Sequence, residues 1–242
     1  MPNLTLEVRR FLSILFFVCL PAWLCAQATS GSIGLLNIPS AEMQKDGTFL
    51  FGANYLPQEF TPSRLSYDSG NYYLNLTFLP FMEVNYRMVL LQNAKTSKYT
   101  EQDRTFGLKL KLFKEKKILP AIAIGGGDIY SEHGDDVNKT FGSYYAVSSK
   151  NLKLKACNVG VTMGFGFNDS PASENTQVHG FFGGVSVTPS CLQQVSFVAE
   201  YDSNTLNVGA TALLFKHLYL HAFVHDFENV VGGFAYKIYL KK

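Results

Sequence analysis

Apolar and non-apolar side chains alternate with a period of two along most of this chain. From Leu206 to Ala212 the even-numbered residues are apolar, and the odd-numbered residues are polar or glycine. From Val159 to Phe167 the same alternation places the apolar residues at odd positions. Successive side chains of a β-strand point to opposite faces, so this period predicts strands with one apolar face. No stretch shows convincing helical periodicity, and the sequence therefore predicts an all-β protein.

The alternation predicts about twelve strands. They are expected near residues 47–56, 71–79, 82–91, 104–113, 118–129, 141–149, 152–167, 179–188, 193–202, 204–214, 216–227 and 230–240. Several alternate for nine or more residues, close to the ~9–11 residues of a tilted transmembrane strand. Longer polar loops are expected at Asn93–Gln102, Ser131–Lys139 and Asn168–Gln177, with short turns between them. The sequence predicts a single antiparallel transmembrane β-barrel, and a soluble β-sandwich is the alternative that the same pattern allows.

The composition narrows the class of protein further. Only 17% of the residues are charged and 47% are hydrophobic, which argues against a disordered, highly solvated chain. The formal net charge is +2, so nucleic acid is not an expected partner. Many glycines fall in mid-strand on the non-apolar face, where a narrow closed barrel needs small inward residues. These are Gly52, Gly107, Gly160, Gly164, Gly166 and Gly209.

Residues 1–26 have the three parts of a secretory signal peptide. Arg9 and Arg10 supply the positive flank, and the apolar stretch Phe11–Leu24 is 14 residues long. A helix needs ~20 residues to span a bilayer, so an uncleaved anchor is the less favoured alternative. Ala26 offers a small residue before the expected cleavage site. We expect the chain to leave the cytoplasm, with residues 27–242 forming one barrel domain.

Two of the four cysteines lie in the signal region, and bulky Trp23 and Leu24 before Cys25 argue against a lipid-modified cysteine. Cys157 and Cys191 remain in the mature chain. An oxidising compartment permits a disulfide between them, and two free thiols agree equally well with the sequence. Neither has a neighbouring Cys or His at metal-ligand spacing, so no zinc site is expected.

Six charged side chains lie on strand faces opposite the apolar residues. They are Glu83, Arg87, Lys109, Lys111, Glu200 and Asp202. In a membrane barrel those faces point into the lumen. Opposite charges there are expected to form a structural network that braces or plugs a narrow pore. The functional alternative is a lumen or mouth that contacts a hydroxyl-rich or acidic polymer.

His217, His221 and His225 follow one another at a spacing of four residues. The residues between them alternate as in a strand, where positions four apart are about 13 Å from each other. One metal ion cannot bridge that gap, because Zn–N bonds are only ~2.1 Å long. We expect the three histidines to form a polar interior row or to lie at the membrane interface. No metal, cofactor or catalytic residue is predicted.

Residues 34–47 precede the first clear strand, and Pro39 and Ser40 make this segment too irregular for a long strand. An ordinary N-terminal lead-in is the default interpretation. The other interpretation is a small plug that folds into the mouth of the barrel.

Several short blocks occur in a fixed order over roughly residues 33–210. They are Gly34–Ala41 with Asp46–Thr48, Glu83–Arg87, Asp103–Leu112, Pro120–Gly125 with Gly127–Ile129, Tyr144–Lys150 and Ala199–Asp202. Each block alone is a weak signal, but the ordered set resembles the YjbH family of Gram-negative envelope proteins. The resemblance implies an outer-membrane β-barrel that accompanies the export or assembly of surface polysaccharide, and it brings no catalytic residues. This chain is shorter than many members, so a role carried by an extra C-terminal region cannot be transferred.

The pattern and the resemblance together predict a non-enzymatic outer-membrane accessory protein in exopolysaccharide production or export. Its expected partners are outer-membrane lipid and either polysaccharide or polysaccharide-export proteins. One alternative is an outer-membrane enzyme that modifies lipid or glycan, which would need a Ser–His or paired-carboxylate cluster at one barrel rim. Another is a soluble secreted β-sandwich that binds glycans.

Overall fold

The computed structural model describes residues 26–60, 66–92, 97–131, 142–167 and 178–241. The predicted signal peptide, residues 1–26, therefore lies outside the described residues except for its last position. Most of the predicted loops Ser131–Lys139 and Asn168–Gln177 also lie outside them. In the part of the chain that is described, no helix has the length and apolar character to cross a membrane.

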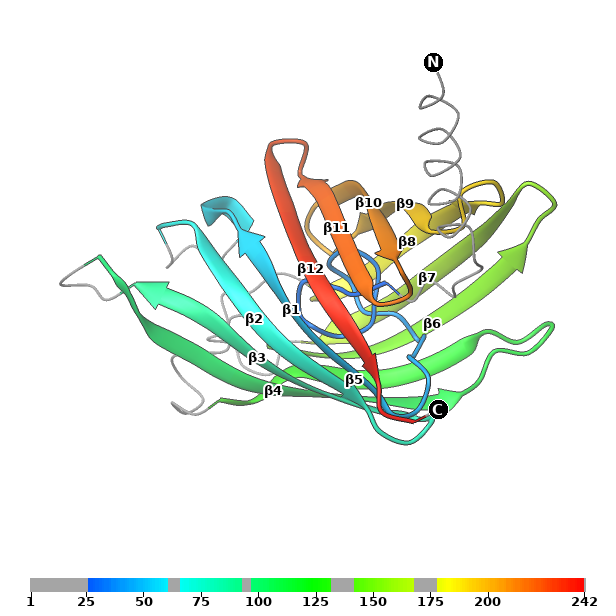
Figure 1. Ribbon diagram of the computed structural model, residues 1–242, viewed down its shortest axis with the longest axis horizontal. Coiled ribbons are helices and arrows are strands. Elements are labelled where there is room, and N and C mark those ends of the chain that lie inside the picture. The colour runs from blue at the N-terminus through cyan, green and yellow to red at the C-terminus, as the bar shows by residue number, and fades with distance from the viewer. Residues whose placement is uncertain (1–25, 61–65, 93–96, 132–141, 168–177, 242) are drawn as a thin grey trace, which may run out of the picture.

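The described residues form twelve β-strands and one short 3₁₀ helix, η1 (Figure 1). Their bounds are β1 Thr48–Leu56, η1 Gln58–Phe60, β2 Ser69–Thr77, β3 Met82–Gln92, β4 Tyr99–Phe113, β5 Ala121–Ser131, β6 Ser143–Lys153, β7 Cys157–Phe167, β8 Gly180–Pro189, β9 Val195–Tyr201, β10 Leu206–Leu214, β11 Leu218–His225 and β12 Asn229–Tyr239. The twelve predicted strands are all present.

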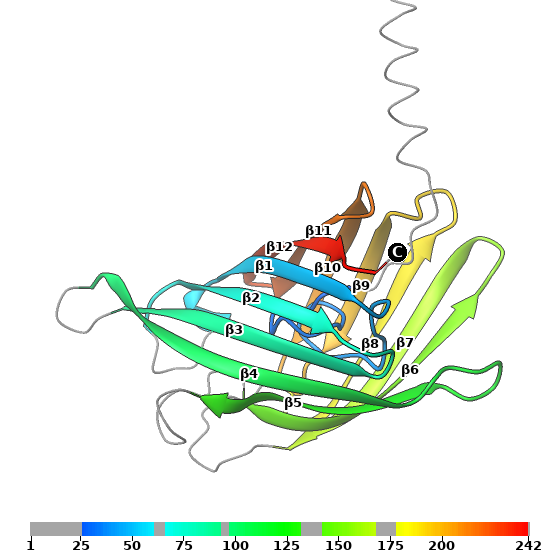
Figure 2. The same cartoon turned by 60° about the horizontal axis from the view of Figure 1, so that its bottom comes forward.

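The strands form one closed barrel in which every neighbour in sequence is an antiparallel neighbour in space (Figures 1 and 2). The ring closes where β1 pairs with β12, from Thr48 opposite Tyr239 to Tyr55 opposite Gly232. A closed sheet leaves no unpaired strand edge, so its backbone hydrogen bonds are made within the barrel. The prediction of a closed antiparallel barrel is confirmed.

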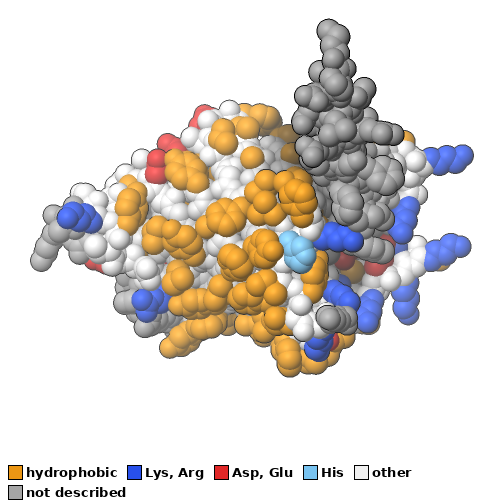
Figure 3. Space-filling view, viewed as in Figure 1, with side chains coloured by type: hydrophobic (Ala, Val, Ile, Leu, Met, Phe, Trp, Pro, Cys, Tyr) orange, Lys and Arg blue, Asp and Glu red, His pale blue; other side chains and the backbone are white. Residues whose placement is uncertain are grey.

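The outer face of the barrel is apolar. In β1 the side chains of Phe51 and Tyr55 point outward and are 41% and 50% exposed, whereas Leu50 and Leu56 are fully buried. The same alternation continues around the ring and covers the outer surface with hydrophobic side chains (Figure 3). A soluble sandwich would bury such faces between two sheets. The sandwich alternative is therefore wrong.

Two strand boundaries differ from the predictions because strand pairing extends beyond the alternating sequence. β4 begins at Tyr99 instead of residue 104, since its first residues pair with Val89–Gln92 of β3. The predicted loop Asn93–Gln102 is accordingly shorter. The turn between β6 and β7 lies at 154–156 rather than at 150–151, because Lys153 still pairs with Asn158.

The two ends of the barrel differ. At one end, which we call the short-turn end, the strands are joined by turns at 78–81, 114–120, 154–156, 190–194 and 215–217. The opposite end, the long-loop end, holds the connections 57–68, 93–98, 132–142 and 168–179 with two short turns at 202–205 and 226–228. The chain enters β1 and leaves β12 at the short-turn end.

The beginning of β1 and the end of β12 are tied together at the short-turn end. The amide of Leu240 donates to the carbonyl of Gly47 at 2.8 Å, and Lys241 Nζ lies 2.7 Å from Asp46 Oδ2. The hydrogen bond from Lys241 lowers the pKa of Asp46 below its usual value. These contacts hold the two termini of the sheet at one point.

Gly164 of β7 tests how closely the barrel interior is packed. A Cβ added at this position would lie 2.3 Å from the ring of Phe182, which is fully buried. We expect Gly164→Leu to destabilise the barrel by about 1–3 kcal/mol, the usual cost of overpacking. Heat-modifiable migration on SDS gels, with unboiled and boiled samples compared over a temperature series, measures the loss.

Met163→Leu is the matched control, because Met163 points outward and is 52% exposed. Equal unfolding temperatures for the two variants would contradict the close packing of the interior.

Candidate functional site

The segment Gln27–Gln44, which we call the plug, lies inside the barrel (Figures 1 and 2). Ala28, Ile33, Leu36 and Ile38 are fully buried there. The plug is a compact double turn held by two isolated bridges, one joining Gln27 to Ile33 and the other Gly34 to Pro39. The lead-in interpretation of residues 34–47 is therefore wrong, and the irregular segment begins earlier than expected.

One glycine of the plug is required by its conformation and by its neighbour. Gly31 has φ +82°, in the left-handed region that side chains rarely adopt. A Cβ at this position would also lie 2.8 Å from Cβ of Tyr73 on β2. The first turn of the plug therefore rests directly against the barrel wall.

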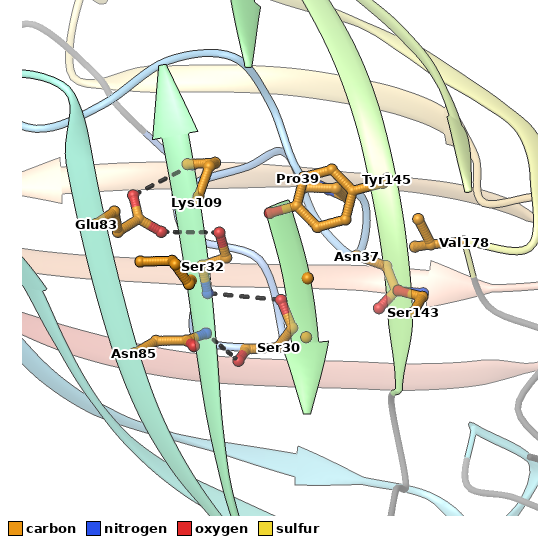
Figure 4. Close-up of a pocket in the computed structure, with 13 residues that line it drawn as sticks. Ser30, Ser32, Asn37, Pro39, Glu83, Asn85, Lys109, Ser143, Tyr145 and Val178 are labelled. Carbon is orange, nitrogen blue, oxygen red and sulfur yellow. Dashed lines mark hydrogen bonds and ion pairs between the residues drawn. The ribbon is translucent and has the colours of Figure 1, made fainter. Parts of the chain in front are cut away.

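Glu83 of β3 and Lys109 of β4 form a buried ion pair, the clamp, that holds the plug at the backbone of Ile33. Figure 4 shows this pair and the bond between Glu83 and Ser32. Glu83 Oε1 accepts hydrogen bonds from Ser32 Oγ at 2.8 Å and from the amide of Ile33 at 3.0 Å. Lys109 Nζ donates to the carbonyl of Ile33 at 2.7 Å and lies 3.2 Å from Glu83 Oε2. Both charged residues are 1% exposed. The ion pair therefore satisfies the donor and the acceptor of the same plug residue.

Glu200 and Asp202, at the end of β9, hold the second turn of the plug. The two oxygens of Glu200 accept from the amides of Leu36 at 2.9 Å and Asn37 at 2.6 Å. Asp202 Oδ2 accepts from the side-chain amide of Asn37 at 2.8 Å. The side chain of Asn207 on β10 donates to both carboxylates, at 3.2 and 3.0 Å. The hydrogen-bonding capacity of these two buried carboxyl groups is used by amide donors.

Four asparagines on β1, β2 and β3 bind the first turn of the plug. Each donates its side-chain amide to a backbone carbonyl of residues 29–31, at 2.8–3.2 Å. They are Asn54, Asn71, Asn75 and Asn85. Sequence reasoning missed this set, although the recurrence of Asn on the non-apolar faces of β1, β2 and β3 was the available signal.

The remaining predicted charges take separate positions. Arg87 of β3 forms a buried ion pair with Asp128 of β5, whose φ of +48° marks an irregular point in that strand. Lys111 of β4 is half-buried, nearer the short-turn end than Lys109. The interior charges thus lie mainly against the plug or in pairs across the wall.

The three histidines do not form one row. His221 is buried between Tyr219 and Phe223, with ring centroids 5.7 and 6.3 Å away, and neither of its ring nitrogens has a hydrogen-bond partner among the described residues. His225 contacts Asn207 Oδ1 at 2.8 Å through Nδ1 and lies against the ring of Phe60.

For His217 the interior-row prediction is wrong, because this residue precedes β11, and its surroundings match the interfacial alternative instead. Its ring stacks on Tyr236 at 5.6 Å and meets Tyr239 edge-on at 5.5 Å, among the outward-facing aromatic side chains. The preceding Phe215 and Lys216 both have positive φ, so the turn breaks the strand alternation on which the prediction rested.

Two of the cavities lined by described residues lie beside the plug. The smaller one, about 30 Å³, lies beside Glu83 and Asn85 and has room for one or two water molecules (Figure 4). The larger one, about 990 Å³, lies between the plug and the wall formed by β6–β9. Lysines of the short-turn end line its mouth, and we call it the rim cavity.

Within the described ranges, no group of three His, Cys, Asp or Glu side chains could hold a metal ion. Cys157 and Cys191 are both free thiols, so the disulfide that the sequence left open is not formed in this structure.

The comparisons with known proteins identify the family of this chain. A family model described as "YjbH: Exopolysaccharide biosynthesis protein YbjH" matches residues 26–210, about three quarters of the chain. The chain belongs to the YjbH family. The match covers the plug and the strands from β1 to the middle of β10, and it confirms the family resemblance of the sequence blocks.

A similar protein of Escherichia coli is named "Uncharacterized lipoprotein YjbH". It is 31% identical over 107 residues, which make up 43% of this chain and 14% of that protein. The matched part of this chain thus corresponds to a small part of that YjbH relative.

The clamp around Ile33 predicts that removing the charge of Glu83 alone greatly lowers the stability of the barrel. Glu83→Gln keeps the shape of the side chain but leaves Lys109 as a buried cation without its anion, a change that typically costs ~3–5 kcal/mol. We expect a lower urea midpoint in detergent micelles. The second change Lys109→Met removes the uncompensated charge and should recover most of the loss.

Glu228→Gln is the control for this prediction, because Glu228 is exposed in the turn between β11 and β12. If Glu83→Gln and Glu228→Gln unfold at the same urea concentration, the clamp does not stabilise the plugged barrel.

Proposed function

We propose that this chain is an outer-membrane β-barrel that acts, without catalysis, in the production or export of exopolysaccharide. The observation that carries the membrane assignment is the continuous apolar outer face of a closed barrel with a polar interior (Figure 3). In lipid, only helices and closed barrels satisfy every backbone polar group internally. The exopolysaccharide assignment rests on the family description.

The orientation follows from the connections between strands. Outer-membrane barrels have short turns on the periplasmic side and longer loops outside the cell. The short-turn end, with the plug entry and the end of β12, then faces the periplasm. Export proteins or nascent polysaccharide would meet the barrel at this end, and lipid would surround its wall.

The non-catalytic assignment is supported by how the interior carboxylates are used. Glu200 and Asp202 share Asn207 and form the paired carboxylates that an enzyme alternative would employ. Both accept hydrogen bonds from Asn37 of the plug and are 2% exposed or less. A substrate would have to displace the plug to reach them, so a structural role suits these residues better.

A charge on the outer face tests the membrane assignment. Phe197 of β9 points outward and is 54% exposed. At the bilayer midplane an arginine costs ~2–4 kcal/mol, so Phe197→Arg should lower the free energy of unfolding in phospholipid vesicles by that amount. Urea titrations followed by tryptic protection of the inserted protein measure the difference.

Leu154→Arg places the same charge in the exposed turn between β6 and β7 and should change stability little. Equal stabilities for Phe197→Arg and Leu154→Arg would mean that the wall does not lie in hydrocarbon.

Deletion of the gene in the native host tests the exopolysaccharide role. We expect less surface polysaccharide, measured by compositional sugar analysis of the cell-surface and periplasmic fractions, and restoration by the full chain on a plasmid. An unchanged amount and composition in both fractions would overturn the role.

A further inference from the structure

The rim cavity is lined by small polar side chains that lie among a larger area of apolar surface. Hydroxyl and amide groups project into it from β6, β7, β8 and β9. They include Ser149, Asn151, Thr162, Ser186, Thr188 and Ser196. Its volume of about 990 Å³ lies at the upper end of the ~300–1,000 Å³ typical of ligand sites. Gly160 and Ser186 face each other across the β7–β8 pair, and their small size keeps this space open.

The hydroxyl groups of the wall retain hydrogen-bonding capacity. Ser149 and Thr162 share one hydrogen bond at 2.9 Å, and Ser149 also accepts from the amide of Ala41 in the plug at 2.9 Å. Thr188 and Ser196 share another at 2.5 Å. A hydroxyl group has one donor and two acceptor sites, so each pair can still bind a further polar group. Such a wall matches a ligand that carries many hydroxyl groups.

The mouth of the cavity is basic. Two segments border it: the turn 114–120, and residues 150–156, which end β6 and form the turn after it. Together they contain six lysines and one acidic residue, Glu115. Lys116, Lys117, Lys150 and Lys153 line the cavity itself. In the space-filling view, Lys and Arg side chains gather at this end of the barrel (Figure 3). The entrance therefore has a positive potential that attracts anions.

Part of this rim is held in place by the plug and by Glu115. Lys150 Nζ lies 3.1 Å from Glu115 Oε1, and Asn151 donates to Glu42 of the plug at 2.7 Å and to Glu115 at 3.0 Å. Although burial raises the pKa of Glu115, the hydrogen bonds from Asn151 and Lys150 outweigh it and lower the pKa below its usual value. Glu115 therefore stays ionised and fixes Lys150, while Lys116 and Lys117 remain exposed.

We propose that the rim cavity binds a segment of an acidic polysaccharide that enters from the short-turn end. Sugar hydroxyl groups meet the Ser, Thr and Asn side chains of the wall, and carboxylate or phosphate substituents meet Lys116, Lys117 and Lys153 at the mouth. This inference rests on the proposed exopolysaccharide function and names the class of polymer.

The wall chemistry favours a glycan over an anionic lipid. A lipid headgroup would also match the lysines, but its acyl chains would cover the hydroxyl and amide groups that lie among the apolar side chains of β6–β9. Burying those polar groups against hydrocarbon costs free energy. The apolar surface that suits acyl chains is on the outside of the barrel.

Calorimetric titration of the full chain in zwitterionic detergent tests the proposal. The probes are a hexamer of mannuronate, which carries a carboxylate on every sugar, and maltohexaose, a neutral hexamer. We expect the acidic hexamer to bind at least tenfold more tightly, and its affinity to fall as salt is raised from 50 to 500 mM. Equal affinities, or binding of neither probe, would overturn the proposal.

Two pairs of matched variants locate the site. Lys116→Gln with Lys117→Gln removes two lysines that line the cavity and should weaken binding of the acidic hexamer about tenfold. Lys114→Gln with Lys155→Gln removes the same charge from the same two segments, away from the cavity lining, and should have less than a twofold effect. Equal effects would show attraction by net charge without a site.

A cavity-filling pair checks the hydroxyl wall separately. Ser186→Phe places a ring in the cavity and should abolish binding of the acidic hexamer, whereas Val187→Phe on the outer face of β8 should retain it. Heat-modifiable migration shows that both variants are folded. Unchanged binding by a folded Ser186→Phe variant would place the ligand elsewhere and overturn the proposal.

The experiments distinguish binding of a lipid headgroup from binding of a glycan, and failure of this inference from failure of the proposed exopolysaccharide role. Competition of the acidic hexamer by phosphatidylglycerol vesicles, with direct lysine-dependent binding of those vesicles, would assign the lysines to lipid headgroups and overturn the glycan site. If gene deletion lowers surface polysaccharide but the hexamer does not bind, only this inference fails. If the hexamer binds through Lys116 and Lys117 but deletion changes nothing, the site stands and the exopolysaccharide role fails.

Discussion

The need of the plug for hydrogen-bond partners shapes the interior of the barrel. An irregular segment has peptide groups that no strand ladder satisfies, and a buried unpaired peptide group costs about as much as a lost hydrogen bond. Here the partners are side chains of the wall. Carboxyl groups of the wall accept from amides of the plug, and asparagine side chains of the wall donate to its carbonyls. The polar residues inside the barrel are therefore placed to bind the backbone of the plug. They do not simply line a water-filled pore.

Different parts of the wall meet the plug with different charge arrangements. At β3 and β4 the anion Glu83 is balanced by Lys109, so the peptide of Ile33 sits beside a neutral pair. At β9 the carboxyl groups of Glu200 and Asp202 accept hydrogen bonds from amide donors of the plug and of Asn207. Removing the plug would strip donors from two buried carboxylates, and this electrostatic cost opposes its release. The wall of β6–β9 facing the rim cavity contributes small neutral side chains instead.

Alternation predicted the strands well because one face of the barrel wall is apolar and the other is polar. Every strand contributes side chains to both faces. It located twelve strands and placed Glu83, Arg87 and Glu200 on the non-apolar faces. Strand ends were less predictable, since Tyr99 and Lys153 are in strands through pairing with their neighbours and not through their own pattern. The plug has no period to detect, and the interior-row prediction failed for His217 because the turn before β11 interrupts the alternation. The asparagine set was missed because its partners are backbone carbonyls of a segment whose path the sequence does not reveal.

The plug precedes β1 in the chain, and β1 is also the strand that closes the ring with β12. That closure joins residue 48 to residue 239 and therefore spans nearly the whole chain, which makes it the strand pairing of this barrel with the largest loop to close. Its first strand arrives with the plug already attached through residues 45–47. The sheet can close around the plug, which is covalently attached to β1, so the plug does not have to be threaded into a closed barrel. The covalent connection between the plug and β1 thus bears both on the order of assembly and on which segment fills the lumen.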